Sequence, residues 1–130
     1  MSPSLAQFKS SLITPVAKVK APFKVECLWQ YSLNVKPSQI WPYLIDTSKM
    51  NKELGLPPWQ EKTIKGELHA STVTLGRTQE WIEKPWIWQH EKELQNHRLY
   101  SRGWMTEQRG VFTVTPTDTG CTVGIYFCWG

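Results

Sequence analysis

Three tryptophans surround a single proline in the stretch 76–94, and this arrangement limits the possible folds more than any other feature of the sequence. Pro85 has a fixed φ and no backbone N–H, so it suits a turn or a strand edge rather than a strand centre. Beyond it, Trp86, Trp88 and His90 share one parity, a period typical of a strand with one buried face. The stretch therefore predicts two antiparallel strands joined at Pro85, in a sheet whose tryptophan face must be covered.

The length and composition of the chain predict one globular domain. Of its 130 residues, 40% are hydrophobic and 20% are charged, which supplies enough apolar material for a core and argues against disorder. The eight tryptophans either fill that core or line a ligand cavity, because large aromatic side chains serve both purposes. Composition does not separate these two uses.

Charge is distributed unevenly along the chain. The net charge is +4, and four lysines precede the first acidic residue: Lys9, Lys18, Lys20 and Lys24. A basic lead of this kind is a solvated tail or a contact with an anionic surface. The arginines, in contrast, are spread over separate predicted strands rather than interleaved with aromatic residues on one face, so we expect no nucleic-acid partner.

The cysteines and histidines carry no recognisable site. The three cysteines contain no CxxC pair and the three histidines lack ligand spacing, so we expect no metal site and no cofactor. No apolar run near the N-terminus is long enough for a signal peptide or a transmembrane segment. Together these features predict a cytoplasmic chain with reduced thiols.

The chain divides into a basic lead segment, residues 1–23, and a domain over residues 24–130. In the lead, Leu5, Phe8 and Leu12 have helical spacing, so the segment is either an arm packed on the domain or a loose tail. The domain begins with clean alternation of apolar and polar residues over 25–35. We expect a half-buried strand there.

Two short helices are predicted directly after this first strand. The first covers about 38–46, with Ser38 as N-cap, which would place Pro42 among the first four helical positions. Amide groups there lack helical partners, so a proline is harmless. The second helix is predicted over about 47–55, before a Pro-Pro pair.

The remaining residues predict six antiparallel strands: 59–68, 71–82, 86–94, 98–105, 110–115 and 121–129. Residues 116–120 form a turn by composition and join the last two strands as a hairpin. A curved sheet with one apolar face needs a lid. Either a partner covers it, or the chain is a fragment truncated before a long C-terminal helix, which is the interpretation we favour.

This order of elements, with the motif Val35-Lys36-Pro37-Ser38-Gln39-Ile40-Trp41, resembles the START-like (SRPBCC) superfamily, which includes Bet v 1 relatives and polyketide cyclase-like proteins. The resemblance covers roughly residues 24–130. It implies an α+β helix-grip fold, in which a curved antiparallel sheet grips a long C-terminal helix around an apolar cavity. Two short helices follow the first strand here, and the long helix is missing from the chain.

A narrower likeness is carried by residues 44–51, 54–58 and 80–88, which look like the START-like domain that precedes a class III adenylate or guanylate cyclase in some bacterial proteins. The paired metal-binding aspartates of such a cyclase are absent from the sequence, so its activity is not carried over. The resemblance implies a regulatory module of a longer signalling protein, with a downstream domain as partner.

We therefore expect a non-catalytic module that binds a small apolar ligand. The candidate ligand-binding residues are aromatic or polar side chains assigned to the apolar face: Trp29, Tyr31, Trp86, Trp88, His90, Tyr100, Phe127 and Trp129. The glutamates at 80, 83, 91 and 93 are expected on a solvated outer face or in a turn.

Two alternatives remain open. The first is a polyketide cyclase or dehydratase-like enzyme, for which His90 with Glu107 or Tyr100 would supply the acid–base pair. The second is a pure interaction module that docks its apolar face on the next domain, because large exposed apolar patches are rare on monomers.

Overall fold

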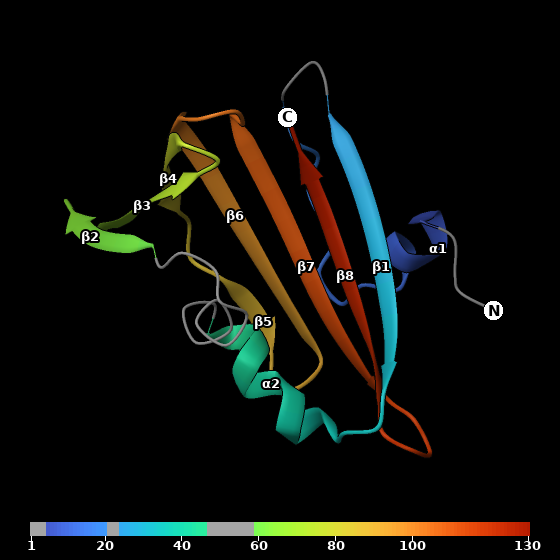
Figure 1. Ribbon diagram of the computed structural model, residues 1–130. Coiled ribbons are helices and arrows are strands. Elements are labelled where there is room, and N and C mark those ends of the chain that lie inside the picture. Colours follow the sequence, from blue (N-terminus) through green and yellow to red (C-terminus); the bar gives the residue numbers. More distant parts are fainter. Residues whose placement is uncertain (1–4, 21–23, 47–58) are drawn as a thin grey trace.

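The computed structural model describes residues 5–20, 24–46 and 59–130, which form an α+β fold with one large antiparallel sheet (Figure 1). Among these residues neither helix is long and apolar enough to cross a membrane. The elements are α1 Leu5–Ser10, β1 Val25–Leu33, α2 Pro37–Ile45, β2 Gln60–Ile64, β3 Glu67–Thr74, β4 Arg77–Glu83, β5 Ile87–Gln89, β6 Glu93–Arg102, β7 Glu107–Pro116 and β8 Cys121–Trp129.

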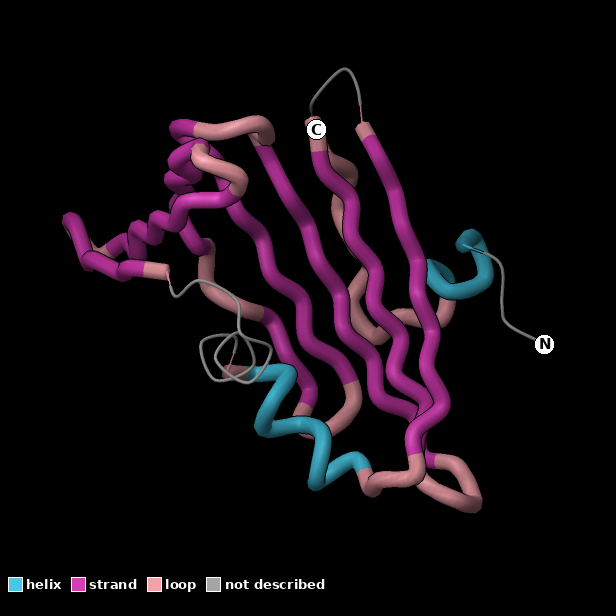
Figure 2. Tube along the Cα trace, viewed as in Figure 1, coloured by secondary structure: helices cyan, strands magenta, loops and turns pink. Residues whose placement is uncertain are grey.

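The first and last strands of the chain, β1 and β8, are neighbours in the sheet. The strand order is β1-β8-β7-β6-β4-β3-β2, with β5 paired to β6 beside this path. The long strands β1, β8, β7 and β6 run side by side and curve together (Figure 2). Helix α2 lies on one face of the sheet, here called the α2 face, and the N-terminal residues 5–20, here called the arm, lie on the opposite arm face (Figure 1).

The core of the α2 face follows from the period-two alternation of β6, β7 and β8. Leu94 is paired with Phe112, and Val114 with Val123, so these side chains point to the same face. Trp41 and Leu44 are three residues apart on α2 and pack onto this cluster. Burying the apolar face of α2 in this way removes large areas of side chain from water.

Helix α2 begins earlier than predicted. Lys36 is its N-cap and Pro37 its first residue, a position where the fixed φ of proline is already helical. The Gln39 side chain accepts a hydrogen bond from the Lys36 N–H at 2.8 Å. Prediction of Ser38 as N-cap was therefore wrong, and Pro42 lies inside the helix. The second predicted helix, 47–55, lies outside the described residues.

The arm is packed on the sheet. Phe8 and Val19 are 3% and 4% exposed and belong to a cluster with Val111, Tyr126 and Cys128. The Phe8 and Tyr126 rings are stacked, with centroids 6.3 Å apart. The sequence left two alternatives for the lead segment, a packed arm or a loose tail. Its described residues form a packed arm.

Two buried carboxylates hold the backbone of the arm. Glu93 accepts hydrogen bonds from the N–H groups of Ile13 and Thr14, at 2.8 and 3.1 Å. Glu107 accepts one from the Lys20 N–H at 2.8 Å. The arm is not a strand of the sheet, so these side chains supply acceptors that a β-ladder would otherwise provide. The assignment of Glu93 to a solvated face was wrong, because its buried carboxylate accepts hydrogen bonds from the backbone of the arm.

The middle of the chain contains more strands than predicted. Strand 59–68 is interrupted by a two-residue turn at Lys65–Gly66, and strand 71–82 by a turn at Leu75–Gly76. Both residues of each turn have positive φ, the geometry that matches the twist of a tight hairpin. The sequence signal was weak because lysine and leucine replace the usual asparagine or aspartate before glycine.

Pro85 does not join two long strands, so that prediction was wrong. β4 pairs with β6, and the residues after Pro85 form only the three-residue β5, which pairs with the start of β6. The chain reverses later, where Glu91 has a φ of 55° and the Lys92 N–H donates to the Gln89 carbonyl at 3.0 Å. The last hairpin, in contrast, is confirmed: β8 covers 121–129 as predicted.

We expect Glu107→Gln to destabilise the protein in a pH-dependent way. Burial alone would raise the pKa of Glu107, but the Lys20 N–H and the His97 side chain, 2.6 Å away, outweigh it and hold the pKa below its usual 4.5. A depressed carboxyl pKa stabilises the fold above the unfolded value, and this contribution is lost as the pH falls through the folded value. The variant should lose about 1–3 kcal/mol of unfolding free energy at pH 7.

Urea denaturation of both proteins at pH 7 and pH 3 measures this difference, which should shrink at pH 3. Glu91→Gln is the control, because Glu91 lies in a turn and contacts the exposed His90. An equal loss for Glu107→Gln at both pH values would contradict the assigned role of the carboxylate.

Candidate ligand-binding pocket

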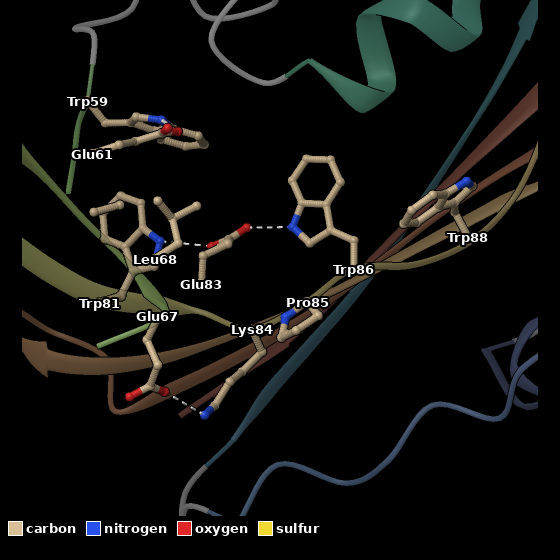
Figure 3. A pocket seen from close by; sticks show the side chains of 12 residues that line it. Trp59, Glu61, Glu67, Leu68, Trp81, Glu83, Lys84, Pro85, Trp86 and Trp88 are labelled. Atoms are coloured by element: carbon tan, nitrogen blue, oxygen red, sulfur yellow. Dashed lines mark hydrogen bonds and ion pairs between the residues drawn. The ribbon is translucent and has the colours of Figure 1, made fainter. Parts of the chain in front are cut away.

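A pocket of about 520 Å³ lies where β2, β3 and β4 meet the segment around Pro85 (Figure 3). Four of the chain's tryptophans are among the residues that line it: Trp59, Glu61, Gly66, Glu67, Leu68, Ala70, Trp81, Glu83, Lys84, Pro85, Trp86 and Trp88. Leu68 is paired with Glu83, and Ala70 with Trp81, so these four side chains share the α2 face.

Glu83 is the polar centre of the pocket wall. One carboxylate oxygen, Oε2, accepts a hydrogen bond from Trp81 Nε1 at 2.9 Å, and Oε1 accepts one from Trp86 Nε1 at 2.8 Å (Figure 3). Oε2 also accepts one from Arg98 Nε at 2.7 Å. The Glu83 and Arg98 side chains are 8% and 11% exposed. Assignment of Glu83 to a solvated face was wrong: it lies two residues from Trp81, on the same face, and three donors replace water around it.

Arg98 fixes two indoles as well as the carboxylate. Its guanidinium carbon lies 4.9 Å from the Trp59 ring centroid and 4.8 Å from that of Trp81. The two indoles meet edge to face, with centroids 5.4 Å apart. A cation above an aromatic face is attracted by the ring quadrupole, more strongly when both are shielded from water. One ion pair therefore positions three of the pocket's tryptophans.

The rim of the pocket is charged and more exposed. Lys84 Nζ lies 3.2 Å from a Glu67 carboxylate oxygen, and Trp59 Nε1 donates to Glu61 at 2.9 Å (Figure 3). Trp88 is 60% exposed and leaves most of its indole open to a ligand. The pocket thus has aromatic walls, one buried carboxylate within them at Glu83, and further charged groups at its edge.

The structure places the predicted ligand-binding aromatics in two groups. Trp86 and Trp88 line the pocket. Four more lie on β1 and β8, farther along the α2 face: Trp29, Tyr31, Phe127 and Trp129. Two of these, together with Trp104, line a separate hollow of about 410 Å³ made by Trp104, Met105, Gln108, Phe127 and Trp129.

Tyr100 and His90 lie outside the pocket lining. Tyr100 packs against Trp81, with centroids 5.6 Å apart, and its hydroxyl donates to Gln108 at 3.0 Å. Burial raises the pKa of the Tyr100 hydroxyl. The His90 side chain is 76% exposed and meets the Trp41 ring edge to face at 6.0 Å.

The acid–base pairs considered for an enzyme are not assembled in the described part of the chain. Glu107 faces the arm and contacts His97 rather than His90. His90 contacts its neighbour Glu91 at 3.3 Å, while the Tyr100 hydroxyl is engaged elsewhere. Register explains the difference, since Glu107 is paired with Leu99 and its side chain lies on the arm face.

Sequence reasoning missed three important residues of this site, Trp59, Trp81 and Glu83. For Trp81 and Glu83 a signal existed, because residues two apart in a strand share a face. Trp59 carried no such signal. It reaches Trp81 only because the β2–β3 and β3–β4 hairpins fold the chain back twice.

The sequence matches no protein-family model and no curated protein. Several solved structures share its fold. The Zhui aromatase/cyclase from Streptomyces sp. R1128 has a TM-score of 0.64 at 8% identity, over 83% of this chain and 68% of that one. Ara h 8.0201 has 0.60 at 9% identity, over 82% and 77%. The di-domain ARO/CYC StfQ from the steffimycin biosynthetic pathway has 0.61 at 12% identity, over 82% and 36%.

We expect Glu83→Ala to destabilise the fold by about 3–5 kcal/mol, because it leaves the buried Arg98 unpaired. The control is Glu80→Ala on the same strand, whose carboxylate is 3.7 Å from Arg102 with both side chains largely exposed. That change should cost no more than about 1 kcal/mol. Urea denaturation measures both, and equal costs would contradict a central role for Glu83.

The three solved structures compared above share 12% sequence identity or less with this chain, so the likeness concerns the fold alone. The chain therefore has the α+β helix-grip fold of Bet v 1-like and aromatase/cyclase structures, as its resemblance to the START-like superfamily implied.

Proposed function

We propose that this chain binds a small, largely apolar ligand in the pocket between β2–β4 and the segment around Pro85. The observation that carries the proposal is the convergence of four indoles on one pocket of about 520 Å³. Small-molecule sites are typically concave, mostly apolar and roughly 300–1,000 Å³ in volume, with few polar groups. This pocket has each of those properties.

The order of the pocket wall supports the proposal. The Glu83–Arg98 pair holds Trp59, Trp81 and Trp86 before any ligand arrives. A ligand then binds without paying the entropy of ordering those side chains. Pre-formed walls are typical of small-molecule sites.

A cyclase or dehydratase-like enzyme is the second candidate. It is supported by the fold shared with two structures named as aromatase/cyclases. Catalysis in this pocket would need an acid–base group other than His90 paired with Glu107 or Tyr100, because the described structure assembles neither pair.

The proposal extends to a regulatory module in a longer cytoplasmic signalling protein, with a downstream domain as partner and a nucleotide cyclase as the expected output. This wider context is supported only by the sequence resemblance of residues 44–51, 54–58 and 80–88. Trp29 and Tyr31, 43% and 50% exposed on the α2 face, offer a surface on which such a domain could dock.

Calorimetric titration with the neutral compounds 2-naphthylmethanol, flavone and decanol tests the proposal. We expect at least one to bind, and Trp88→Ala to weaken it about tenfold, since removal of an aromatic contact costs on the order of 1–2 kcal/mol. Trp88 suits the test because it is 60% exposed, so its loss spares the core. Trp29→Ala, a tryptophan outside the pocket, is the control and should bind like the parent. Heat from none of the three compounds, or equal losses in both variants, would refute binding at this pocket.

A further inference from the structure

Three of the four indole N–H groups of the pocket are already used by the protein. Trp59 donates to Glu61 at 2.9 Å, while Trp81 and Trp86 both donate to Glu83. These indoles therefore offer a ligand their ring faces rather than a hydrogen-bond donor. Ring faces carry the negative part of the aromatic quadrupole, so they attract cations and repel anions.

The charges around the pocket leave one carboxylate without a cation. Arg98 neutralises Glu83, and Lys84 pairs with Glu67. In the part of the chain that the structure describes, no basic side chain lies within ion-pair distance of Glu61. Among the described residues around the pocket, three carboxylates thus face two cations, a net charge of −1.

The protein itself places a cation against these indoles. The Arg98 guanidinium lies within 5 Å of the Trp59 and Trp81 ring centroids and is not one of the lining residues, so it approaches the aromatic wall from outside the pocket. Trp86 and Trp88 line the open side, and among the described residues no cation lies over either ring. Within the described residues, neither ring therefore has a cation of the protein against it.

From these observations we infer that the pocket selects ligands with an apolar body and a cationic head, such as a primary or quaternary ammonium group held by Trp86, Trp88 and Glu61. This inference rests on the proposed function and names the class of ligand. An anionic ligand would meet ring faces and the unpaired Glu61, and Lys84 would have to leave Glu67 to bind it.

Three probes that share one apolar body test the selection. They are (2-naphthylmethyl)trimethylammonium, neutral 2-naphthylmethanol and anionic 2-naphthylacetate, each titrated into the protein by calorimetry at low ionic strength. The cation should bind about tenfold tighter than the neutral probe, the scale of a partly desolvated cation–π contact. The anion should bind most weakly of the three.

Glu61→Gln isolates the charge, because the amide oxygen can still accept the Trp59 N–H. We expect this variant to weaken the cationic probe about three- to tenfold, in a salt-dependent way, and to leave the neutral probe within about twofold. Asp118→Asn is the matched control, since Asp118 is an exposed acid in the β7–β8 turn, outside the pocket lining. It should change neither probe.

The outcomes separate this inference from the proposed function. If the neutral probe binds and Trp88→Ala weakens it, but the cation has no advantage, cation selection is wrong while ligand binding stands. A cation preference that Glu61→Gln leaves intact would also overturn the assignment to Glu61. If none of the three naphthyl probes binds, cation selection is wrong, and ligand binding fails with it only when flavone and decanol also give no heat.

Discussion

The buried ion pair between Glu83 and Arg98 is the interaction on which the candidate site depends. Removing both charges from water is costly, and an ion pair alone often fails to offset that cost. Here two indole N–H groups complete the carboxylate and two indole faces flank the guanidinium. The same contacts that satisfy the charges fix three tryptophans. The shape of the pocket and the burial of the ion pair therefore depend on each other.

The opposite face of the sheet uses acidic side chains in a related way. Glu93 and Glu107 accept backbone N–H groups from the arm, which no neighbouring strand satisfies. On both faces, glutamates that resemble surface residues in the sequence are buried acceptors, for nearby indoles and Arg98 on the α2 face and for distant backbone N–H groups on the arm face. A carboxylate offers several acceptor positions, which makes it suited to collecting donors of different origin.

Prediction from the sequence succeeded where one local signal decided the outcome. Alternation of apolar and polar residues over 25–35 predicted β1. A turn rich in turn-forming residues at 116–120, followed by clean alternation, predicted β8. Prediction failed between 59 and 105, where tight hairpins divide the predicted strands and the turns lack Asn-Gly or Asp-Gly. For the candidate pocket, the predicted Trp86 and Trp88 are among its lining residues, whereas the position of Trp59 depended on two hairpins that the sequence did not predict.

The sequence by itself determined which residues share a face, because side chains on a strand alternate with a period of two whatever the strand pairs with. It also determined the final hairpin, whose turn is local. Tertiary structure alone decided that Arg98 reaches Glu83, that Trp59 reaches Trp81, and that the arm lies on the far face. Each of these contacts depends on the register between strands or on docking across a long sequence separation, and a repeat of two residues carries no information about which strand lies alongside.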